Sequence, residues 1–397
     1  KLRFPEFTGE WEEKKLGHFF KDLKTGMTPY RGNLDYFKGR IPWITSGELC
    51  YNIILKTNEY ITEQAIKDTN LKIYEPNTLF IAITGLEAPG TRGKCALNGI
   101  PAATNQSCMA FEAHPNINTR FLFYWYNKYG TFLYYKYAQG TKQQSFNNAI
   151  VENFDFIYST LAEQTKIATF LTAVDEKLTQ LKKKKTLLEQ YKKGVMQKLF
   201  SQELRFKDDN NQDFPDWQEK TLGEVGDIVT GKTPSTTNID LWNGEIQFVT
   251  PTDINDDKYQ FSTQRTIKAL SKTKVLPIKS IMFTCIASIG KISLSIKPCI
   301  TNQQINSIIP YKEFDNEFIY YSLLNIVDYI RSTQSSNTLP IINKTDFSKF
   351  VIQVPCLPEQ QKIANFLSSI DEKINQCSAQ IEKMEAWKKG LLQQMFC

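Results

Sequence analysis

Five polar segments of this chain carry side chains suited to binding nucleic acid. They span residues 29–33, 90–94, 140–148, 231–238 and 332–338. Arg, Lys, Asn and Gln make paired hydrogen bonds to base edges, whereas Ser, Thr and glycine-rich backbone suit phosphates. Any one of these loops, taken alone, is more often ordinary surface than a contact. The candidate contacts are Thr28, Tyr30, Arg31, Arg92, Lys94, Lys142, Gln143, Gln144, Asn147, Lys232, Thr233, Ser235, Thr236, Lys291, Gln334, Ser335 and Asn337.

The sequence offers little for catalysis. Its only histidines are His18 and His114, no CxxC pair or Cys/His cluster occurs, and the GxxxxGK[ST] phosphate loop is missing. No NPPY-like loop for a flipped adenine is found. The acidic pairs that recur in both halves, residues 175–176 and 371–372, lie in predicted helices and have a structural explanation. We therefore expect a binding protein with no catalytic residue, no bound metal and no cofactor of its own.

An internal repeat positions these loops. Residues 163–200 and 359–396 match at a constant offset of 196, as in Glu163 and Glu359 or Phe200 and Phe396. A period of this length exceeds that of solenoid repeats and indicates two tandem domains with a pseudo-twofold relation. The predicted segments are a globular domain at 1–157, a helical arm at 158–203, a second globular domain at 204–354 and a second arm at 355–397.

Each arm is predicted to be one long helix with an apolar seam. The seam keeps coiled-coil spacing, which Lys388 interrupts in the second arm. We expect the arms to pair as an antiparallel coiled coil; the alternative is that each arm folds back on its own domain. The seam residues are Ile167, Leu171, Val174, Leu178, Leu181, Ile363, Leu367, Ile370, Ile374 and Ile381.

The net charge lies mainly in the first arm. Residues 161–200 contain nine lysines and four acidic residues, whereas residues 358–397 contain five of each, against a net charge of +6 for the chain. The lysine run 182–185 fits either a solvated helix face or contact with a nucleic-acid backbone or an acidic partner. The globular domains are nearly neutral, so net charge alone does not establish DNA binding.

The globular domains share short matching segments, here called anchors. Their sequences differ in the stretches between these anchors. TGMTP at residues 25–29 matches TGKTP at an offset of 205, and TNQ at residues 104–106 matches at 197. Strand-like runs at 78–84 and 280–287 predict mixed α/β domains. The aromatic run 121–137 has helical spacing and is expected to face a core rather than to stack on bases. The divergence between anchors fits domains that bind different ligands; drift of surface loops would give the same pattern.

Composition places the chain in a broad class. With 41% hydrophobic and 23% charged residues, it is expected to be folded and cytoplasmic. It has neither an apolar run of membrane-spanning length nor a signal-peptide core at residues 1–15. The start KLRF matches LRF at residues 204–206, so we expect an initiating Met and a few residues before Lys1.

At this point the layout resembles a known family. Two divergent domains alternate with helices that contain LAEQTKIATFL and LPEQQKIANFL and end in KKGVMQKLF and KKGLLQQMF. This resembles the DNA specificity subunit of type I restriction-modification systems, over essentially the whole chain. One departure, Ala162 against Pro358, suggests a local difference where the two helices begin.

The resemblance implies a function and partners. Each globular domain would be a target-recognition domain for one half of a bipartite, asymmetric sequence in double-stranded DNA, and the arms would set the gap. Expected partners are two modification (methyltransferase) subunits and restriction subunits, which would bind S-adenosylmethionine and ATP. The competing classes are a non-enzymatic coiled-coil adaptor for protein or other ligands and a self-contained methyltransferase, for which we find no catalytic loop.

Overall fold

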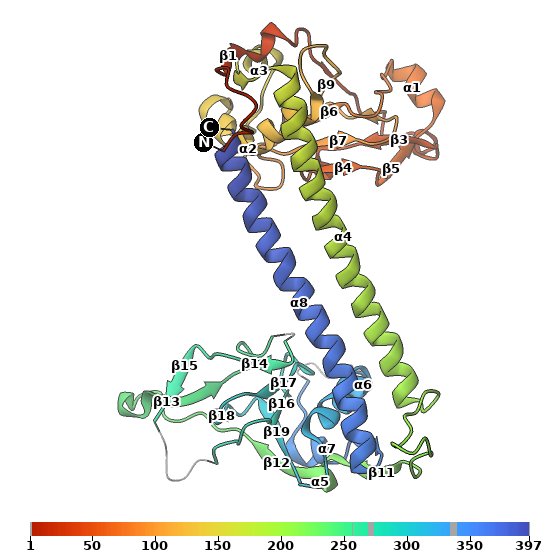
Figure 1. Ribbon diagram of the computed structural model, residues 1–397, viewed down its shortest axis with the longest axis vertical. Coiled ribbons are helices and arrows are strands. Elements are labelled where there is room, and N and C mark those ends of the chain that lie inside the picture. Colours follow the sequence, from red (N-terminus) through yellow and green to blue (C-terminus); the bar gives the residue numbers. More distant parts are fainter. Residues whose placement is uncertain (1, 256, 269–273, 334–339, 397) are drawn as a thin grey trace. The chain divides into compact units, whose positions relative to one another are not determined.

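The structure is a computed structural model that describes residues 2–255, 257–268, 274–333 and 340–396. It forms two compact units. The first unit comprises Lys1–Lys182 and Ala379–Cys397, and the second comprises Lys183–Ser378. Each unit is therefore one globular domain together with part of each long helix, and the two units are described separately below (Figure 1).

The two predicted arms are single long helices. Helix α4 spans Leu161–Phe200 and α8 spans Leu357–Met395. Both begin at equivalent positions, so the difference suggested by Ala162 and Pro358 does not occur. Proline is tolerated in the first helical turn because the backbone N–H there has no partner within the helix.

The predicted seam lies on the inner faces of these helices. Eight of its residues are buried, and Ile374 and Ile381 are half-buried. In the first unit α4 and α8 run antiparallel, because Asp175 contacts Lys388 at 2.5 Å while Lys182 contacts Glu385 at 2.6 Å. In the second unit Lys192 contacts Asp371 at 2.6 Å.

The arms also pack on the globular domains. Antiparallel pairing of the arms and packing of each arm on its own domain therefore both occur. Leu171, near the start of α4, and Phe396, just after α8, share the core of the first unit. Leu199 and Leu367 share the core of the second unit in the same way. Each core therefore takes the first turns of one arm and the last turns of the other.

Both globular domains have the same sheet topology. Each contains a five-stranded sheet, a three-stranded sheet and a two-stranded pair, with matching strand order. In the first unit the three orders are β2 (Lys24–Thr25), β9 (Cys108–Phe111), β6 (Leu79–Ala82), β7 (Cys95–Asn98), β4 (Asn52–Ile54); β5 (Glu59–Ile61), β3 (Ile41–Ile44), β8 (Ala103–Thr104); and β1 (Glu12–Lys15), β10 (Asp155–Tyr158). In the second unit they are β12 (Gly226–Thr230), β19 (Ile305–Pro310), β16 (Ile281–Thr284), β17 (Ile292–Ser295), β14 (Tyr259–Gln260); β15 (Arg265–Ile267), β13 (Trp242–Val249), β18 (Cys299–Thr301); and β11 (Gln218–Thr221), β20 (Val351–Val354).

Helix α2 (Thr119–Tyr137) packs on β6 and β7 of the first five-stranded sheet, and α6 (Asn316–Ser332) packs on β16, β17 and β19 of the second. The first unit also contains α1 (Glu63–Thr69) and α3 (Asn148–Glu152), and the second also contains α5 (Leu222–Val225) and α7 (Lys344–Ser348). Side chains of Asn118 and Asp315 cap α2 and α6. The aromatic run of α2 faces the core, as predicted, with Phe121 and Trp125 at most 1% exposed.

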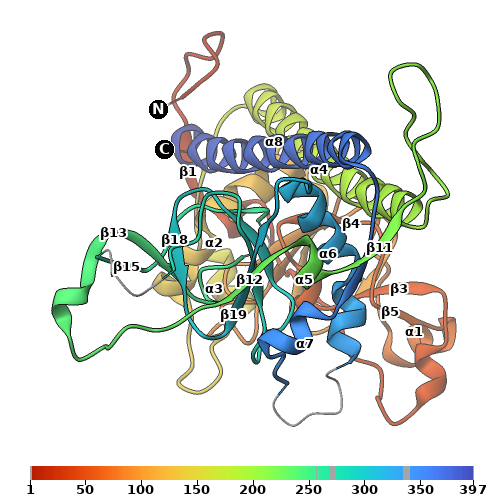
Figure 2. The ribbon, with the colours of Figure 1, turned by 90° about the horizontal axis from the view of Figure 1, so that it is seen from below.

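The three-stranded sheets project from the domains. In the first unit β3, β5 and α1 lie away from α2 (Figure 1). In the second unit β13 and β15 extend away from α6 (Figure 2). The TGxTP segments lead into these projecting sheets, which places the candidate loops at 29–33 and 231–238 at their margins.

A duplicated cluster, here called the glutamate clamp, joins the start of each domain to its arm. The first unit pairs Arg3 with Glu163 through two hydrogen bonds of 2.6 and 2.7 Å, and the second pairs Arg205 with Glu359 at 3.2 and 2.8 Å. A tryptophan N–H donates to the same carboxylate at 3.2 Å in both units. The clamp consists of Arg3, Trp11 and Glu163 in the first unit and Arg205, Trp217 and Glu359 in the second.

Candidate nucleic-acid interface

In each unit the TGxTP segment packs on the TNQ segment, and the two together are called the base of the neighbouring candidate loop. The Thr28 hydroxyl donates to Gln106 Oε1 at 2.5 Å, and the Thr233 hydroxyl donates to Gln303 Oε1 at 2.6 Å. TGxTP therefore packs on TNQ in each unit, which explains why both short motifs recur. These two threonines, predicted as DNA contacts, hold the base together.

The glycine of each TGxTP segment is needed for this close approach. A Cβ on Gly26 would lie 1.7 Å from the Thr104 carbonyl oxygen, and a Cβ on Gly231 would lie 2.2 Å from that of Asn302. Neither space holds a methyl group, so only glycine lets the two backbones meet.

Beyond this base, each unit presents an exposed tip that the sequence analysis missed. Asn33 and Asn238 accept hydrogen bonds from the backbone N–H groups two residues later and cap short 3-10 helices. Leu34 and Ile239 follow them and are 71% and 77% exposed. The 205-residue offset of the TGxTP match continues through Asn-Leu-Asp and Asn-Ile-Asp, and this signal could have revealed the tips.

Arg31 lies beside the first tip but is held by its own domain. Its guanidinium makes two hydrogen bonds to Glu59 and lies over the Phe37 ring at 4.5 Å. The hydrogen bonds from Arg31 lower the pKa of the Glu59 carboxyl. In the second unit Arg265, from β15, lies over Trp242 at 5.4 Å. Trp242 matches Phe37 at the 205 offset, so both units place a guanidinium on this aromatic ring, from different segments.

Arg92 fastens the loop between β6 and β7. It donates to the carbonyls of Leu86 and Glu87 at 3.2 and 2.7 Å and to the Tyr135 hydroxyl at 2.8 Å. Lys94 lies over the Tyr51 ring at 4.4 Å. In the second unit Lys291 donates to the Pro251 carbonyl at 3.3 Å. These cations stabilise loops, so contact with DNA would require them to exchange or share partners.

The loop between α2 and α3 has anchored and open members. The Tyr134 hydroxyl donates to Gln144, whose backbone N–H donates to Glu87 at 2.9 Å. Asn147 caps α3. Lys142 and Gln143 are exposed and have no side-chain partner among the described residues.

The candidate residues that the structure describes thus divide into a group with partners and a group without them. Those whose side chains are exposed and unpaired within the described part of the chain are Tyr30, Lys142, Gln143, Lys232 and Thr236. Ser235 contributes its hydroxyl to Thr237 at 2.9 Å and its carbonyl to Trp242 at 3.0 Å. Gln334, Ser335 and Asn337 lie outside the described residues. The unpaired group comes from loops around the projecting sheet and the α2–α3 turn.

The part of the chain that the structure describes also contains potential metal ligands and thiols. There, no three His, Cys, Asp or Glu side chains are grouped to hold a metal ion. Burial raises the pKa of the Cys108 thiol to about 12, and it also raises that of Cys285 to about 12. No helix among the described residues has both the length and the apolarity to cross a membrane.

The duplicated fold, with matched bases and divergent loops, defines a class of protein built from two related domains on long paired helices. The family model described as "Type I restriction modification DNA specificity domain" matches residues 8–190 and 215–385. The chain belongs to this family.

Curated relatives carry the same name. The chain is 30% identical over 196 residues to the type I restriction enzyme MjaIX specificity subunit of Methanocaldococcus jannaschii, covering 47% of this chain and 45% of that protein. It is 35% identical over 146 residues to the HindI specificity subunit of Haemophilus influenzae, covering 35% of this chain and 32% of that protein. These alignments span less than half of either relative.

Two comparisons extend over nearly the full length. The putative MjaX specificity subunit of M. jannaschii is 24% identical, over 99% of this chain and 94% of that protein. The crystal structure of an S subunit from M. genitalium superposes with a TM-score of 0.64 and 18% identity, covering 98% of this chain and 96% of that one. The structural likeness shows that the two chains share a fold.

Proposed function

We propose that this chain is the sequence-specific DNA-recognition subunit of a type I restriction-modification complex. Each globular domain would bind one half of a bipartite, asymmetric target in double-stranded DNA. The paired helices would set the gap and dock two modification subunits, which would bind S-adenosylmethionine, and restriction subunits would supply ATP-driven activity in the cytoplasm. No catalytic residue is assigned to this chain.

The observation that supports this most directly is how the two units differ. They keep the base formed by TGxTP and TNQ, the strand order and the glutamate clamp. They differ at the exposed positions around that base, where Tyr30 and Arg31 of the first unit correspond to Ser235 and Thr236 of the second. A shared scaffold with different exposed side chains is what two domains for different half-sites require.

The test is to co-express the chain with its modification subunit in a methylation-free host and to map 6-methyladenine across the genome. We expect one bipartite motif that is lost when this chain is omitted. Lys142→Ala with Gln143→Ala should relax one half-site, and Lys232→Ala with Thr236→Ala should relax the other. If an assembled, active partner leaves no motif, a coiled-coil adaptor becomes the better explanation.

A further inference from the structure

A polar cluster recurs where α4 and α8 meet in each unit. The first consists of Tyr124, Asp175 and Lys388, and the second consists of Tyr321, Asp371 and Lys192; they are called the pairing clusters below. In each, the aspartate of one long helix binds a lysine of the other and accepts a hydrogen bond from a tyrosine of α2 or α6. All three residue types are identical in the two copies, although the surrounding domains have diverged.

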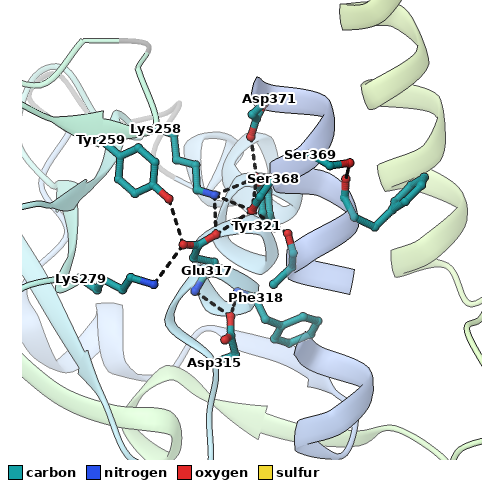
Figure 3. A network of polar contacts seen from close by, with 12 residues as sticks. Lys258, Tyr259, Lys279, Asp315, Glu317, Phe318, Tyr321, Ser368, Ser369 and Asp371 are labelled. Carbon is teal, nitrogen blue, oxygen red and sulfur yellow. Dashed lines mark hydrogen bonds and ion pairs between the residues drawn. The ribbon is translucent and has the colours of Figure 1, made fainter. Parts of the chain in front are cut away.

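The geometry of the two clusters matches closely. Lys388 Nζ lies 2.5 Å from Asp175 Oδ1, and the Tyr124 hydroxyl donates to Asp175 Oδ2 at 2.8 Å. Lys192 Nζ lies 2.6 Å from Asp371 Oδ1, and the Tyr321 hydroxyl donates to Asp371 Oδ2 at 2.5 Å. Figure 3 shows the second tyrosine and aspartate, with Ser368 one turn earlier on α8.

These ion pairs are more enclosed than ordinary surface pairs. The side chains of Asp371 and Lys192 are 13% and 17% exposed, and those of Asp175 and Lys388 are 28% and 16% exposed. Exposed pairs contribute little to stability, whereas placing a like charge opposite an enclosed, oriented carboxylate is strongly unfavourable. The clusters can therefore discriminate between correct and incorrect alignments of the two helices.

The lysines occupy an informative position. Lys388 interrupts the apolar seam of α8, and Lys192 interrupts that of α4 at the equivalent place. A polar residue at a seam position of a coiled coil lowers stability but fixes alignment and partner. Both lysines also lie over the cluster tyrosine, at 5.8 and 5.3 Å from the ring centroids.

The spacing within each helix makes the two clusters interdependent. Lys192 follows Asp175 by 17 residues on α4, and Lys388 follows Asp371 by 17 residues on α8. In an antiparallel pair with this alignment, both ion pairs form together. A shift along the helix axis, or parallel pairing, would separate both lysines from their aspartates.

We propose that the pairing clusters determine the direction and the alignment in which α4 pairs with α8. The site is an interaction surface, and its partner is the α8 helix of the same chain. The proposal rests on the proposed function only for its consequence, a defined gap between half-sites. Its test needs neither DNA nor a partner subunit, so the two proposals can fail separately.

The repeat supplies a charge-neutral test. Reversing α4 alone, with Asp175→Lys and Lys192→Asp, places like charges opposite each other in both clusters without changing the net charge. Two such helices from different chains remain complementary to each other, as do two native α8 helices. We therefore expect this variant to pair α4 with α4 and α8 with α8 between chains, with about twice the molar mass of the native 45.8 kDa chain by light scattering.

Two further variants complete the experiment. Adding Asp371→Lys and Lys388→Asp restores opposite charges within one chain and should restore the native mass and urea midpoint. The matched control, Glu176→Lys with Lys193→Glu, makes the same charge changes at exposed positions beside the clusters and should keep the native mass. A native mass and midpoint for the α4-reversed chain, failure of the fourfold variant to recover, or dimerisation of the control would each overturn the proposal.

Discussion

The two units keep the same pairing cluster but surround it with different charges. In the second unit Glu317 on α6 binds Lys258 Nζ at 2.7 Å, and Lys258 also donates to Ser368 (Figure 3). In the first unit Arg120 stands where Glu317 stands in the second. Asn52 takes the place of Lys258, because Ile53 pairs with Leu97 and Tyr259 pairs with the equivalent Leu294.

This exchange shows what the duplication preserves. A cation lies near the cluster in both units, but it comes from the strand side in one and from the helix in the other. Arg120 Nη1 donates to Thr172 at 3.3 Å, and Thr172 is the counterpart of Ser368. The Tyr–Asp–Lys contacts between α4 and α8 are therefore retained. The charged residues around them differ between the units, and they differ as a pair, on the strand and on the helix.

The largest expected effect comes from a charge in the shared seam. Leu171→Asp and Leu367→Asp each bury a carboxylate where the leucine is fully buried, and each should lower the free energy of unfolding by about 4 kcal/mol. Urea denaturation measures both. The control Leu187→Asp, at a leucine of α4 that is 54% exposed, should change stability by about 0.5 kcal/mol or less. A small cost at only one of the two seam positions would break the equivalence of the units.

Glycine substitutions test the shared base of the loops. Gly26→Ala and Gly231→Ala should each cost about 3 kcal/mol, because the added methyl group meets backbone oxygen. Gly194→Ala and Gly390→Ala are matched controls, since nothing lies within 4 Å of a Cβ at these helix positions. The controls should raise stability by about 0.5 to 1 kcal/mol. Thermal unfolding distinguishes the two pairs, and equal effects would contradict the close approach.

The two units should differ in how their stability depends on pH at low pH. Burial alone would raise the pKa of the Glu317 carboxyl, but hydrogen bonds from Lys258 and Ser368 outweigh it and lower this pKa to about 2. Because the folded-state pKa lies below the unfolded value near 4.5, this stabilisation is complete above that pH and is lost as the pH falls toward 2.

Glu317→Gln removes this titration. The difference in unfolding free energy between pH 6 and pH 3 should shrink by about 2 kcal/mol, measured by urea denaturation. Arg120→Gln, at the equivalent position of the first unit, should leave that difference unchanged. An equal response of both variants would show that the charge exchange between units has no energetic consequence.

The smallest effects are expected at exposed loop residues. In the assembled complex, Lys142→Ala and Lys232→Ala should each reduce the slope of log K against log salt by about 1 and cost about 1 kcal/mol or less in DNA binding. The isolated chain should bind DNA weakly, since its domains carry almost no net charge. Fluorescence anisotropy across a salt series measures both quantities, and nanomolar binding by the isolated chain at physiological salt would argue against shared phosphate contacts.

The sequence predicts the duplication and the long helices because those features are local and periodic. Leu161–Phe200 has a continuous seam, and its copy lies at a constant offset. The strand order is different in kind: β2 pairs with β9 across more than eighty residues, and no local pattern specifies that contact. The shared strand order becomes clear only when the structures of the two domains are compared, because their sequences have diverged.

The candidate site was only partly predictable for the same reason. Arg92 has the right chemistry for base contacts, but its partners Tyr135 and Glu87 come from elsewhere in the fold. Lys388 was visible as a break in the seam, whereas its partner Asp175 lies in the other arm. Residue type indicates which contacts a side chain can make, and the tertiary structure determines which partners it has within the protein.

The position of Phe396 also affects how the chain folds during synthesis. Phe396 packs against Phe121 and Trp11, with ring centroids 5.1 and 6.2 Å apart, and so completes the core of the first unit. The second unit is a continuous stretch of sequence, residues 183–378, and residues 379–396, which follow it, belong to the first unit. The first unit is therefore completed by a segment that is translated after the whole of the second unit, and its aromatic core stays incomplete until that segment is available.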